Sequence, residues 1–244
     1  MNPVDTIELR RSDQRFHTDL GWLDSRHSFS FGHHYRPDET GHGLLIVSND
    51  DRVAPGGGFA SHAHRDMEIV SWVLEGSLEH RDSEGNHGVV LPGQVQRMSA
   101  GTGVVHSETN HSAVAPLRFL QMWVVPDTRG LDPSYEQRDM NDALAEGGLV
   151  PVASGRDHPG AVRIHQAGAA MWVGRLDPGE TVELPDSAFV HLFVAIGEVV
   201  FDGHRTERLG AGDAVRLRSH GPARVRADQR AEIIIWESDA EVRR

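Results

Sequence analysis

Two short residue pairs constrain the fold of this chain more than any other feature. His62 and His64 are separated by one residue, and about forty residues later so are His106 and Glu108. Side chains at positions i and i+2 of a β-strand point to the same face. Each pair can therefore direct both members at one point. If the two strands face each other across a barrel, three imidazoles and one carboxylate surround a single metal ion.

The histidine content makes one such pair weak support by itself. With 16 histidines in 244 residues, roughly one His-x-His pattern is expected by chance. An alternative interpretation of the four residues is a hydrogen-bonded polar network inside a barrel, or a set of independent surface side chains. The sequence around them has to decide between these interpretations.

Composition excludes several classes of site. The chain has no cysteine, which excludes disulfides, thiolate metal ligands and cysteine nucleophiles. All 24 basic residues are arginine, which excludes a Schiff-base lysine and a phosphate-loop lysine. The net charge of −12 argues against direct binding of nucleic acid. No apolar run has the length of a membrane span, and the first residues lack the signal-peptide pattern. We therefore expect a cytoplasmic protein that does not bind a membrane.

Short apolar segments separated by glycine and proline predict an all-β chain, either a sandwich or a barrel. One stretch, 134–146, is the only segment predicted to be helical. The segments predicted as strands are 6–10, 21–35, 44–48, 68–74, 77–82, one through Gln96 and Met98, 117–125, 161–165, 170–176, 180–184, 189–196, 198–202, 214–218 and 232–236.

A polar stretch after residue 126 divides the chain into two halves. It contrasts with the strands before it and is the best candidate for an inter-domain connection. We predict an N-terminal metal-binding barrel over residues 1–130. Residues 131–244 are then a linker with a short helix, followed by a C-terminal barrel.

The two halves also resemble each other, which indicates an internal repeat. Aligning Gly76 with Gly197 places Glu183 and Pro185 at the positions of the first histidine pair. Nothing like the second pair follows in the C-terminal half. We therefore expect two similar barrels, of which the second has no metal.

The residues of the first half resemble those of cupins. A glycine, five residues and His62-x-His64 match the opening of the first cupin motif, and Gly76 matches its close. The second cupin motif ends in a histidine followed four residues later by an asparagine, as His106 and Asn110 do. These matches favour the metal site over the polar network.

One departure from the usual cupin motif is informative. Ile69 stands where cupins have a ligand glutamate, and the adjacent Glu68 should face the other way by strand alternation. The carboxylate would then come from Glu108, which is the pattern of the pirin family. The resemblance to pirins runs from about Gly21 to Arg138 and more loosely beyond it, through GWLDSRHSFSFGHHY, HAHRDMEIVSWVLEGSLEHRDSEGN, MSAGTGVVHSETN and YEQRD.

The resemblance to pirins implies a fold of two cupin barrels, each a double-stranded β-helix or jelly roll, in one chain. It also implies one divalent transition metal ion held by His62, His64, His106 and Glu108. Fe(II) is the ion we expect, although Mn(II), Co(II), Ni(II) and Zn(II) suit the same ligands. For Glu68 we expect a structural hydrogen-bonding role.

Bacterial pirin-like proteins are associated with quercetin 2,3-dioxygenase activity, which opens a flavonol ring and releases carbon monoxide. The resemblance therefore implies an oxidoreductase that takes a small aromatic, flavonol-like substrate and dioxygen, with Glu108 as ligand and general base. We expect a monomer. Two alternatives stay open. One is an iron-dependent, redox-sensing regulator that binds a partner protein without turnover, and the other is a cupin isomerase or lyase acting on a phosphorylated or sugar substrate.

Aromatic and histidine side chains near these motifs carry weaker expectations. Trp72, Phe29 and Trp123 are expected in the core rather than beside a substrate. For the three histidines of the upstream segment, His27, His33 and His34, packing and a place at the edge of the pocket both remain open.

Overall fold

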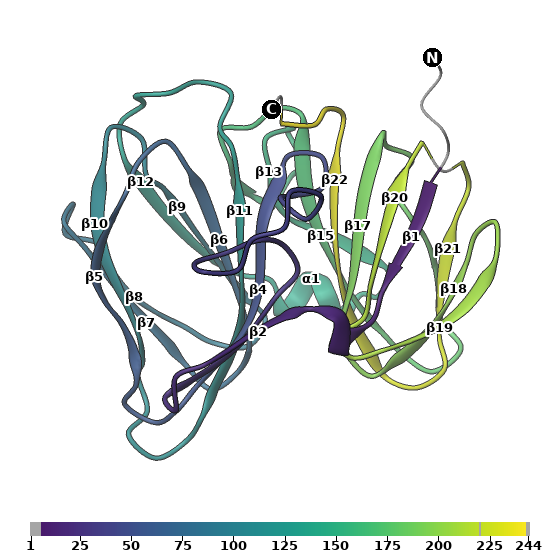
Figure 1. The fold of residues 1–244 in the computed structure, drawn as a ribbon, viewed down its shortest axis with the longest axis horizontal. Helices are drawn as coiled ribbons and strands as arrows, with labels where there is room; N and C mark the ends of the chain where they lie inside the picture. The colour runs from purple at the N-terminus through teal and green to yellow at the C-terminus, as the bar shows by residue number, and fades with distance from the viewer. Residues whose placement is uncertain (1–5, 220, 243–244) are drawn as a thin grey trace.

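The computed structural model describes residues 6–219 and 221–242, which form two β-barrels side by side (Figure 1). Each barrel combines a seven-stranded sheet with a four-stranded sheet, and neither barrel is closed. The only α-helix in this part of the chain is α1, Asn141–Ala145. The prediction of an all-β chain with two jelly-roll barrels is therefore confirmed. No helix among the described residues is both long and apolar enough to cross a membrane.

The first barrel contains most of the N-terminal half. Its larger sheet has the order β12 (Ser134–Asp139), β9 (Gln94–Ser99), β6 (Glu68–Glu75), β11 (Leu117–Val124), β4 (Leu45–Val53), β3 (Leu23–His27) and β2 (Phe16–Asp19). Its smaller sheet has the order β5 (Gly58–His64), β10 (Val104–Asn110), β7 (Leu78–Asp82) and β8 (His87–Val90).

The second barrel repeats this plan. Its larger sheet has the order β1 (Thr6–Arg10), β20 (Ala214–Arg218), β17 (Phe189–Ile196), β22 (Ala231–Ser238), β15 (Ala169–Leu176), β13 (Leu149–Ser154) and β14 (Val162–Arg163). Its smaller sheet has the order β16 (Thr181–Glu183), β21 (Arg224–Ala227), β18 (Glu198–Asp202) and β19 (Thr206–Gly210). A short 3₁₀ helix, Ser12–Gln14, follows β1.

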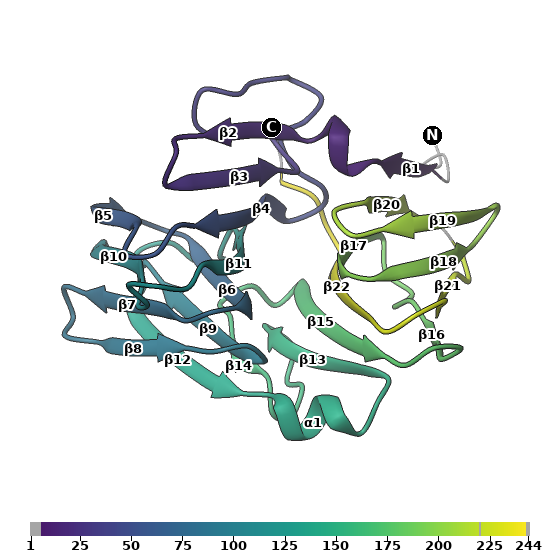
Figure 2. The same ribbon diagram turned by 90° about the horizontal axis from the view of Figure 1, so that it is seen from below.

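The two larger sheets lie toward each other and share one hydrophobic core (Figure 2). This core joins side chains of β4, β6 and β11 to side chains of β15, β17 and β22. Trp72 is fully buried in it, and its indole Nε1 donates a 2.7 Å hydrogen bond to Glu232 of the second barrel. Strands of these sheets are therefore buried on both faces, which explains their nearly continuous apolar sequences. The smaller sheets lie on the outer sides.

Two strands cross between the predicted domains. β1 pairs with β20 of the second barrel, although it lies in the N-terminal half. β12 pairs with β9 of the first barrel, although it follows residue 130. The division at residue 130 remains a prediction, and these pairings add two connections across it.

The helix predicted over 134–146 is wrong for its first half. Residues 134–139 form β12, and the helix starts only at Asn141. The strand is held by polar contacts: the Tyr135 hydroxyl donates to Gln96 Oε1 at 3.1 Å, and Gln137 Nε2 donates to the Val89 carbonyl at 2.9 Å. Apolar periodicity cannot detect a strand whose side chains contact their neighbours through hydrogen bonds instead of apolar packing.

The strand predicted over 21–35 is also too long. It ends at His27, and the chain then turns, with the His34 N–H donating to the Phe31 carbonyl at 3.0 Å. Phe29 nevertheless lies in the core, as expected. The alternation that suggested one long strand continues into a loop that leaves the sheet.

Two glycines mark the same turn in the two barrels. Gly76 follows β6 and Gly197 follows β17, each with φ of +79°. A Cβ at Gly76 would lie 2.4 Å from the Pro116 carbonyl oxygen, and one at Gly197 would lie 2.3 Å from the Arg230 carbonyl oxygen. The turn thus needs both a left-handed backbone and a close approach of the neighbouring strand, which only glycine allows.

We expect Gly76→Ala to lower the free energy of unfolding by about 2–4 kcal/mol, because it adds a steric clash to an unfavourable φ. Gly21→Ala is the matched control, since Gly21 has the same φ of +79° and no atom within 4 Å of a Cβ. It should cost about 1–2 kcal/mol. Urea denaturation of both variants measures the difference, and equal losses would contradict the proposed clash.

Candidate metal centre

The two residue pairs lie on neighbouring strands of the smaller sheet in the first barrel. β5 and β10 are antiparallel partners, with His62 directly opposite His106 and His64 opposite Val104. The expectation that the two strands face each other across the barrel is therefore wrong. Adjacent strands bring the same side chains together over a shorter distance, and alternation still directs each pair inward.

Three histidines converge at this place. Ligand atoms of His62, His64 and His106 all lie within 4.8 Å of one another, and the Nε2 atoms of His62 and His106 are 3.1 Å apart. Two nitrogens bound to one ion at about 2.1 Å, at angles of 90–110°, would lie about 3.0–3.4 Å apart. His64 Nε2 is buried and has no hydrogen-bond partner among the described residues. The arrangement therefore suits a metal ion.

The protonation of these rings also suits metal binding. Burial, together with the nearby His62, lowers the pKa of His64 to about 4. Burial, followed by the charges of His62 and His64, lowers the pKa of His106 to about 3. Both imidazoles are therefore neutral near pH 7, which is the form that binds a metal.

Glu108 is a buried carboxylate held only by neutral donors. It is 1% exposed, and burial raises its pKa above the ordinary range. Ser71 Oγ donates to Oε1 at 3.3 Å, Gln96 Nε2 donates to Oε1 at 3.0 Å, and Gln121 Nε2 donates to Oε2. A buried charge without a cationic partner is costly. A metal ion beside this carboxylate would supply the opposite charge.

His80 is a member of the site that the sequence did not indicate. Glu108 belongs with His106 and His80 to a second group of possible ligands, rather than to the group of three histidines. The Nδ1 atoms of His80 and His106 are 3.5 Å apart, and His80 Nε2 lies 3.1 Å from Asp82 Oδ2. The contacts from Asp82 through His80 to His106 hold the His106 ring with its Nε2 toward His62. The alternating pair His80-x-Asp82 was the available signal.

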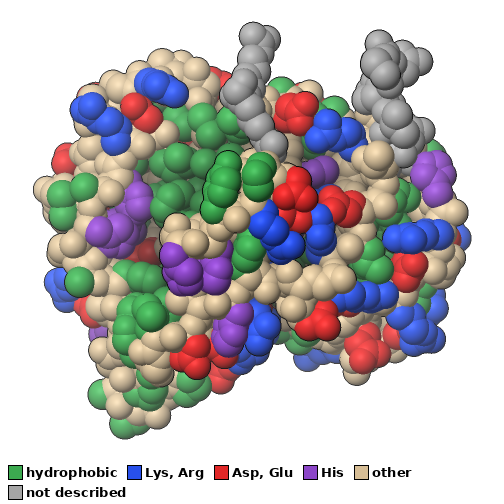
Figure 3. Space-filling view, in the orientation of Figure 1, with side chains coloured by type: hydrophobic (Ala, Val, Ile, Leu, Met, Phe, Trp, Pro, Cys, Tyr) green, Lys and Arg blue, Asp and Glu red, His purple; other side chains and the backbone are tan. Residues whose placement is uncertain are grey.

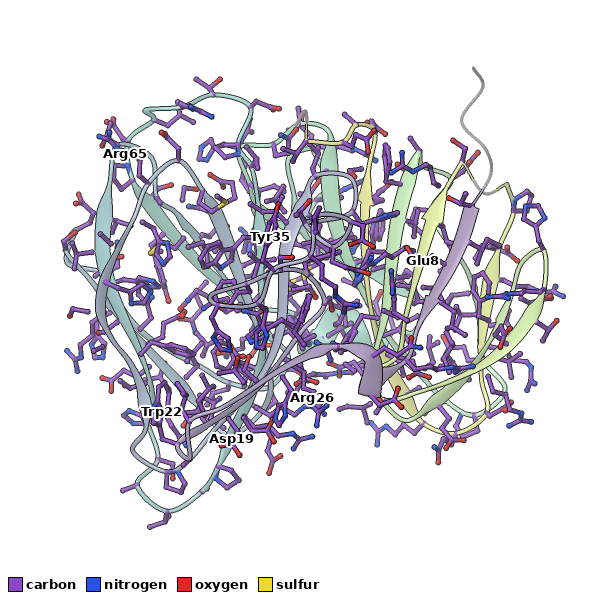
Figure 4. All side chains as sticks on the ribbon, in the orientation of Figure 1. Glu8, Asp19, Trp22, Arg26, Tyr35 and Arg65 are labelled. Carbon is purple, nitrogen blue, oxygen red and sulfur yellow. The ribbon has the colours of Figure 1, made fainter. Side chains whose placement is uncertain are left out.

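A cavity of about 460 Å³ opens beside the histidines. Its aromatic wall consists of Trp22, Phe31, Phe59 and Trp123, and Trp22 lies at the lower side of the barrel (Figure 4). Trp123 meets the His64 ring edge to face at 4.9 Å. Trp123 thus lines the cavity and also packs against a buried hydrophobic cluster, whereas Trp72 is fully buried in the core as expected.

The space-filling view shows where this site opens. Histidine side chains gather on the face of the first barrel, beside hydrophobic side chains that surround a hollow (Figure 3). The hollow contrasts with the second barrel, whose interior is filled by an apolar cluster that includes Leu192, Phe201 and Ile235. At the position aligned with His62, Glu183 is exposed and lies opposite Arg224 in the register of β16 and β21. No other group of possible metal ligands occurs in the described residues, in either barrel.

Glu68 takes a structural position rather than a place in the site. Its Oε2 accepts hydrogen bonds from Ser99 Oγ at 2.8 Å and from the His165 backbone N–H at 3.0 Å. It therefore ties the first barrel to the segment that enters the second. Asn110 is likewise structural, since its side-chain amide donates to the carbonyls of Val53, Ala54 and Ala115.

Asp51 is a second buried carboxyl group in the cavity wall. It is 2% exposed, and burial raises its pKa from 3.8 to about 7, with Asp50 and Glu108 adding to the rise and Ser25 and Arg15 opposing it. The folded chain therefore holds this proton more tightly than the unfolded chain. The contribution of this group to the free energy of unfolding is fully present below about pH 4 and is lost as the pH rises through about 7.

We expect Asp51→Asn to remove this dependence on pH. Between pH 4 and pH 8 the wild type should lose up to about 4 kcal/mol of unfolding free energy relative to the variant. Asp24→Asn, which changes an exposed carboxylate on β3, is the control. It keeps Asp51, so the difference in unfolding free energy between this variant and the wild type should not follow this trend. Urea denaturation across this range measures the difference. A constant difference between wild type and Asp51→Asn would rule out a raised pKa at this residue.

Comparison with known proteins shows what this chain is similar to. Residues 9–124 match the family profile described as pirin, and residues 151–237 match the profile described as quercetinase C-terminal cupin domain. A Mycobacterium tuberculosis protein, provisionally named a quercetin 2,3-dioxygenase, is 50% identical over 97% of both chains. The quercetin 2,3-dioxygenase of Escherichia coli K12 is 37% identical over 95% of this chain and 98% of its own.

Solved structures agree with these similarities. The crystal structure of the bacterial pirin YhhW from Escherichia coli, in complex with nickel(II), superposes with a TM-score of 0.88. The two sequences are 35% identical, and the match covers 97% of this chain and all of the other.

Proposed function

This chain belongs to the pirin family, and on that premise we propose that it is a metal-dependent dioxygenase that opens the ring of a flavonol such as quercetin. One observation carries the proposal: ligand atoms of His62, His64 and His106 lie within 4.8 Å of one another beside an aromatic-walled cavity of about 460 Å³, which Glu108 also lines. The names of the relatives support the same activity.

We propose His62, His64, His106 and Glu108 as the residues that hold one divalent transition metal ion. The facing Nε2 atoms, the unpartnered His64 Nε2 and the uncompensated carboxylate support this assignment. The bound ion would supply a Lewis acid that lowers the pKa of a substrate hydroxyl and a redox centre for reaction with dioxygen. Fe(II) is our proposed ion, and the nickel(II) complex of the Escherichia coli pirin supports a divalent one.

Glu108 is proposed as the proton acceptor for the substrate hydroxyl beside the histidines. Burial raises the pKa of Glu108, so its carboxylate is a stronger base than an exposed one. The amide donors Gln96 and Gln121 keep its oxygens in place before and after the transfer.

The aromatic wall would hold the flat rings of the substrate. Trp22 and Phe59 meet edge to face at 5.3 Å, and Phe31 meets Trp123 in the same way at 5.6 Å. Such side chains provide a large apolar surface with little loss of conformational entropy on binding. They also exclude water from the atoms that react.

Oxygen uptake and carbon monoxide release test this proposal. Protein loaded separately with each candidate divalent ion is mixed with a panel of flavonols that includes quercetin. We expect one metal form to consume dioxygen and release carbon monoxide in equal amounts, and the metal-stripped protein to do neither. Absence of both signals with every ion and every flavonol would contradict the proposed activity.

A further inference from the structure

The wall of the cavity opposite the proposed ligands contains a row of polar side chains. Asn49 and Asp51 point to the same side of β4, because they are two residues apart, and both line the cavity. Directly across on β3, Ser25 pairs with Asp51 and His27 pairs with Asn49. All four side chains are at most 3% exposed. A buried polar row of this kind is stable only if its members satisfy each other.

Their hydrogen bonds form a chain that leads away from the cavity. Ser25 Oγ donates to Asp51 Oδ1. The Nδ1 atom of His27 lies 3.4 Å from Ser25 Oγ and 2.9 Å from Asn49 Oδ1. On the other side of the same ring, Nε2 lies 2.9 Å from Thr18 Oγ1. The chain thus passes from β4 through β3 to β2.

The last link brings the chain to the surface. Thr18 Oγ1 also lies 3.0 Å from His34 Nε2. Thr18 and His34 are half-buried, and the neighbouring His33 is exposed. The β2–β3 hairpin lies along the edge of the larger sheet, so this end of the chain faces away from the barrel interior (Figure 2).

One placement of the hydrogens satisfies every contact in this chain. His34 Nε2–H donates to Thr18, the Thr18 hydroxyl donates to His27 Nε2, and His27 Nδ1–H donates to Asn49 and Ser25. The Ser25 hydroxyl then donates to the Asp51 carboxylate. Each member is therefore a donor to the next, in one direction, and each is a hydroxyl or an imidazole. These are the groups that can pass a proton along by giving one up and receiving another.

Glu108 has no such connection in its described contacts. Two of its three partners are the amides of Gln96 and Gln121, which donate a hydrogen bond but do not exchange the proton readily. The third, Ser71, is completely buried. Of the two carboxyl groups in the cavity, Asp51 is the one whose described hydrogen bonds lead to the surface.

We propose that Asp51 exchanges a substrate proton with solvent, and that Ser25, His27, Thr18 and His34 carry it. The inference rests on the proposed function for the nature of the substrate, a hydroxyl-bearing aromatic compound. The O–H bond of a second substrate hydroxyl, apart from the one beside the histidines that Glu108 deprotonates, breaks. Its proton adds to an Asp51 oxygen, and the electron pair stays on the substrate oxygen. The Ser25 and Thr18 hydroxyls and the His27 ring proton then reverse, so that each member donates away from Asp51. One proton passes from Asp51 to each member in turn and leaves from His34, and this transfer restores the placement of hydrogens described above. One proton enters and one leaves.

The pKa values of Asp51 and His27 suit the transfer of a proton along these hydrogen bonds. Burial raises the pKa of Asp51 to about 7, so both of its protonation states are accessible near neutral pH. Asp50 and Glu108 add to this rise, and Arg15 opposes it. Burial lowers the pKa of His27 to about 4, with contributions from His34, Arg15 and His33, so its ring is neutral and can both accept and donate.

Thr18→Val tests the relay, because it removes one hydroxyl and keeps the shape of the side chain. Metal-loaded protein and quercetin are mixed without oxygen in weak buffer, and two signals are followed: ionisation of quercetin by its absorbance and proton arrival in bulk by an indicator dye. We expect the variant to bind quercetin as the wild type does and to release the proton more slowly, on the order of 10²-fold. Ser25→Ala should behave alike.

His17→Gln is the matched control. His17 precedes Thr18, is exposed, and contacts Asp24 on the outer face of the hairpin. Its replacement should leave proton release unchanged. Wild-type proton release in Thr18→Val would overturn the relay, even if quercetin is bound and turned over.

A second measurement does not depend on activity. Nitrogen NMR of the His27 ring should show a neutral ring with its proton on Nδ1, and Thr18→Val should shift the Nε2 resonance. A proton on Nε2, or a charged ring at pH 7, would overturn the relay. If the wild type ionises no flavonol, the proposed function fails, and the NMR result alone then decides whether the chain of hydrogen bonds exists.

Discussion

Replacing His106 with alanine is expected to abolish metal retention and flavonol turnover together. His106 is the residue that the two groups of possible ligands share, and its Nε2 faces that of His62 at 3.1 Å. Changing a residue that only supports a metal ligand already costs 10–100-fold in affinity, so loss of the ligand itself should cost more than about 100-fold. Metal analysis after gel filtration, with oxygen uptake on the same sample, measures both effects.

His111→Ala is the control for this experiment. His111 follows β10 directly, but its side chain is exposed and contacts Glu79 at the surface. It should keep its metal and its activity. Since His106 is buried, circular dichroism must show that the His106→Ala variant is folded. A folded His106→Ala protein that retains stoichiometric metal would exclude this residue as a ligand.

Glu108→Gln is expected to lower the turnover number by about 10²–10⁴-fold while the protein stays folded. Glutamine has the same shape but cannot accept the substrate proton. The variant also removes the uncompensated buried charge that burial makes unfavourable, so its stability without metal should be at least that of the wild type. Steady-state oxygen uptake gives the kinetic effect, and urea denaturation gives the effect on stability.

This variant also separates an enzyme from a regulator. A redox-sensing regulator without turnover would show no flavonol-dependent oxygen uptake in the wild type, and Glu108→Gln would alter only the binding of a partner protein. A variant that turns over quercetin at the wild-type rate would contradict the assignment of Glu108 as the base.

Strand alternation is a local rule, so the sequence could indicate that His62, His64 and His106 lie close together. His62 and His64 point inward from one strand and His106 and Glu108 from another, as their spacing requires. The repeat was also readable, because the equivalent turns at Gly76 and Gly197 have the same left-handed backbone and therefore both need glycine. Alternation does not show which strands are neighbours. The prediction therefore placed the two strands on opposite sides of the barrel, whereas β5 and β10 are adjacent.

The remainder of the cavity depends on contacts that are distant in the sequence. Asp51 is buried between neighbouring strands, where Ser25 of β3 donates a hydrogen bond to it, and nothing in the local sequence of β4 indicates this burial. His80 joins the site through β10, its partner in the smaller sheet. Trp123 lies in β11, a strand of mostly buried residues, but its side chain faces the cavity and contacts His64. The roles of Asp51, His80 and Trp123 therefore depend on which strands and side chains the fold brings beside them.

The most direct test of the proposed metal site is anomalous diffraction from crystals of the metal-loaded protein, recorded at the absorption edge of the ion. We expect one anomalous peak per chain in the first barrel, at about 2.0–2.3 Å from ring nitrogens of His62, His64 and His106 and from an oxygen of Glu108. A peak in the second barrel only, or a peak in the first barrel that these side chains do not contact, would contradict it.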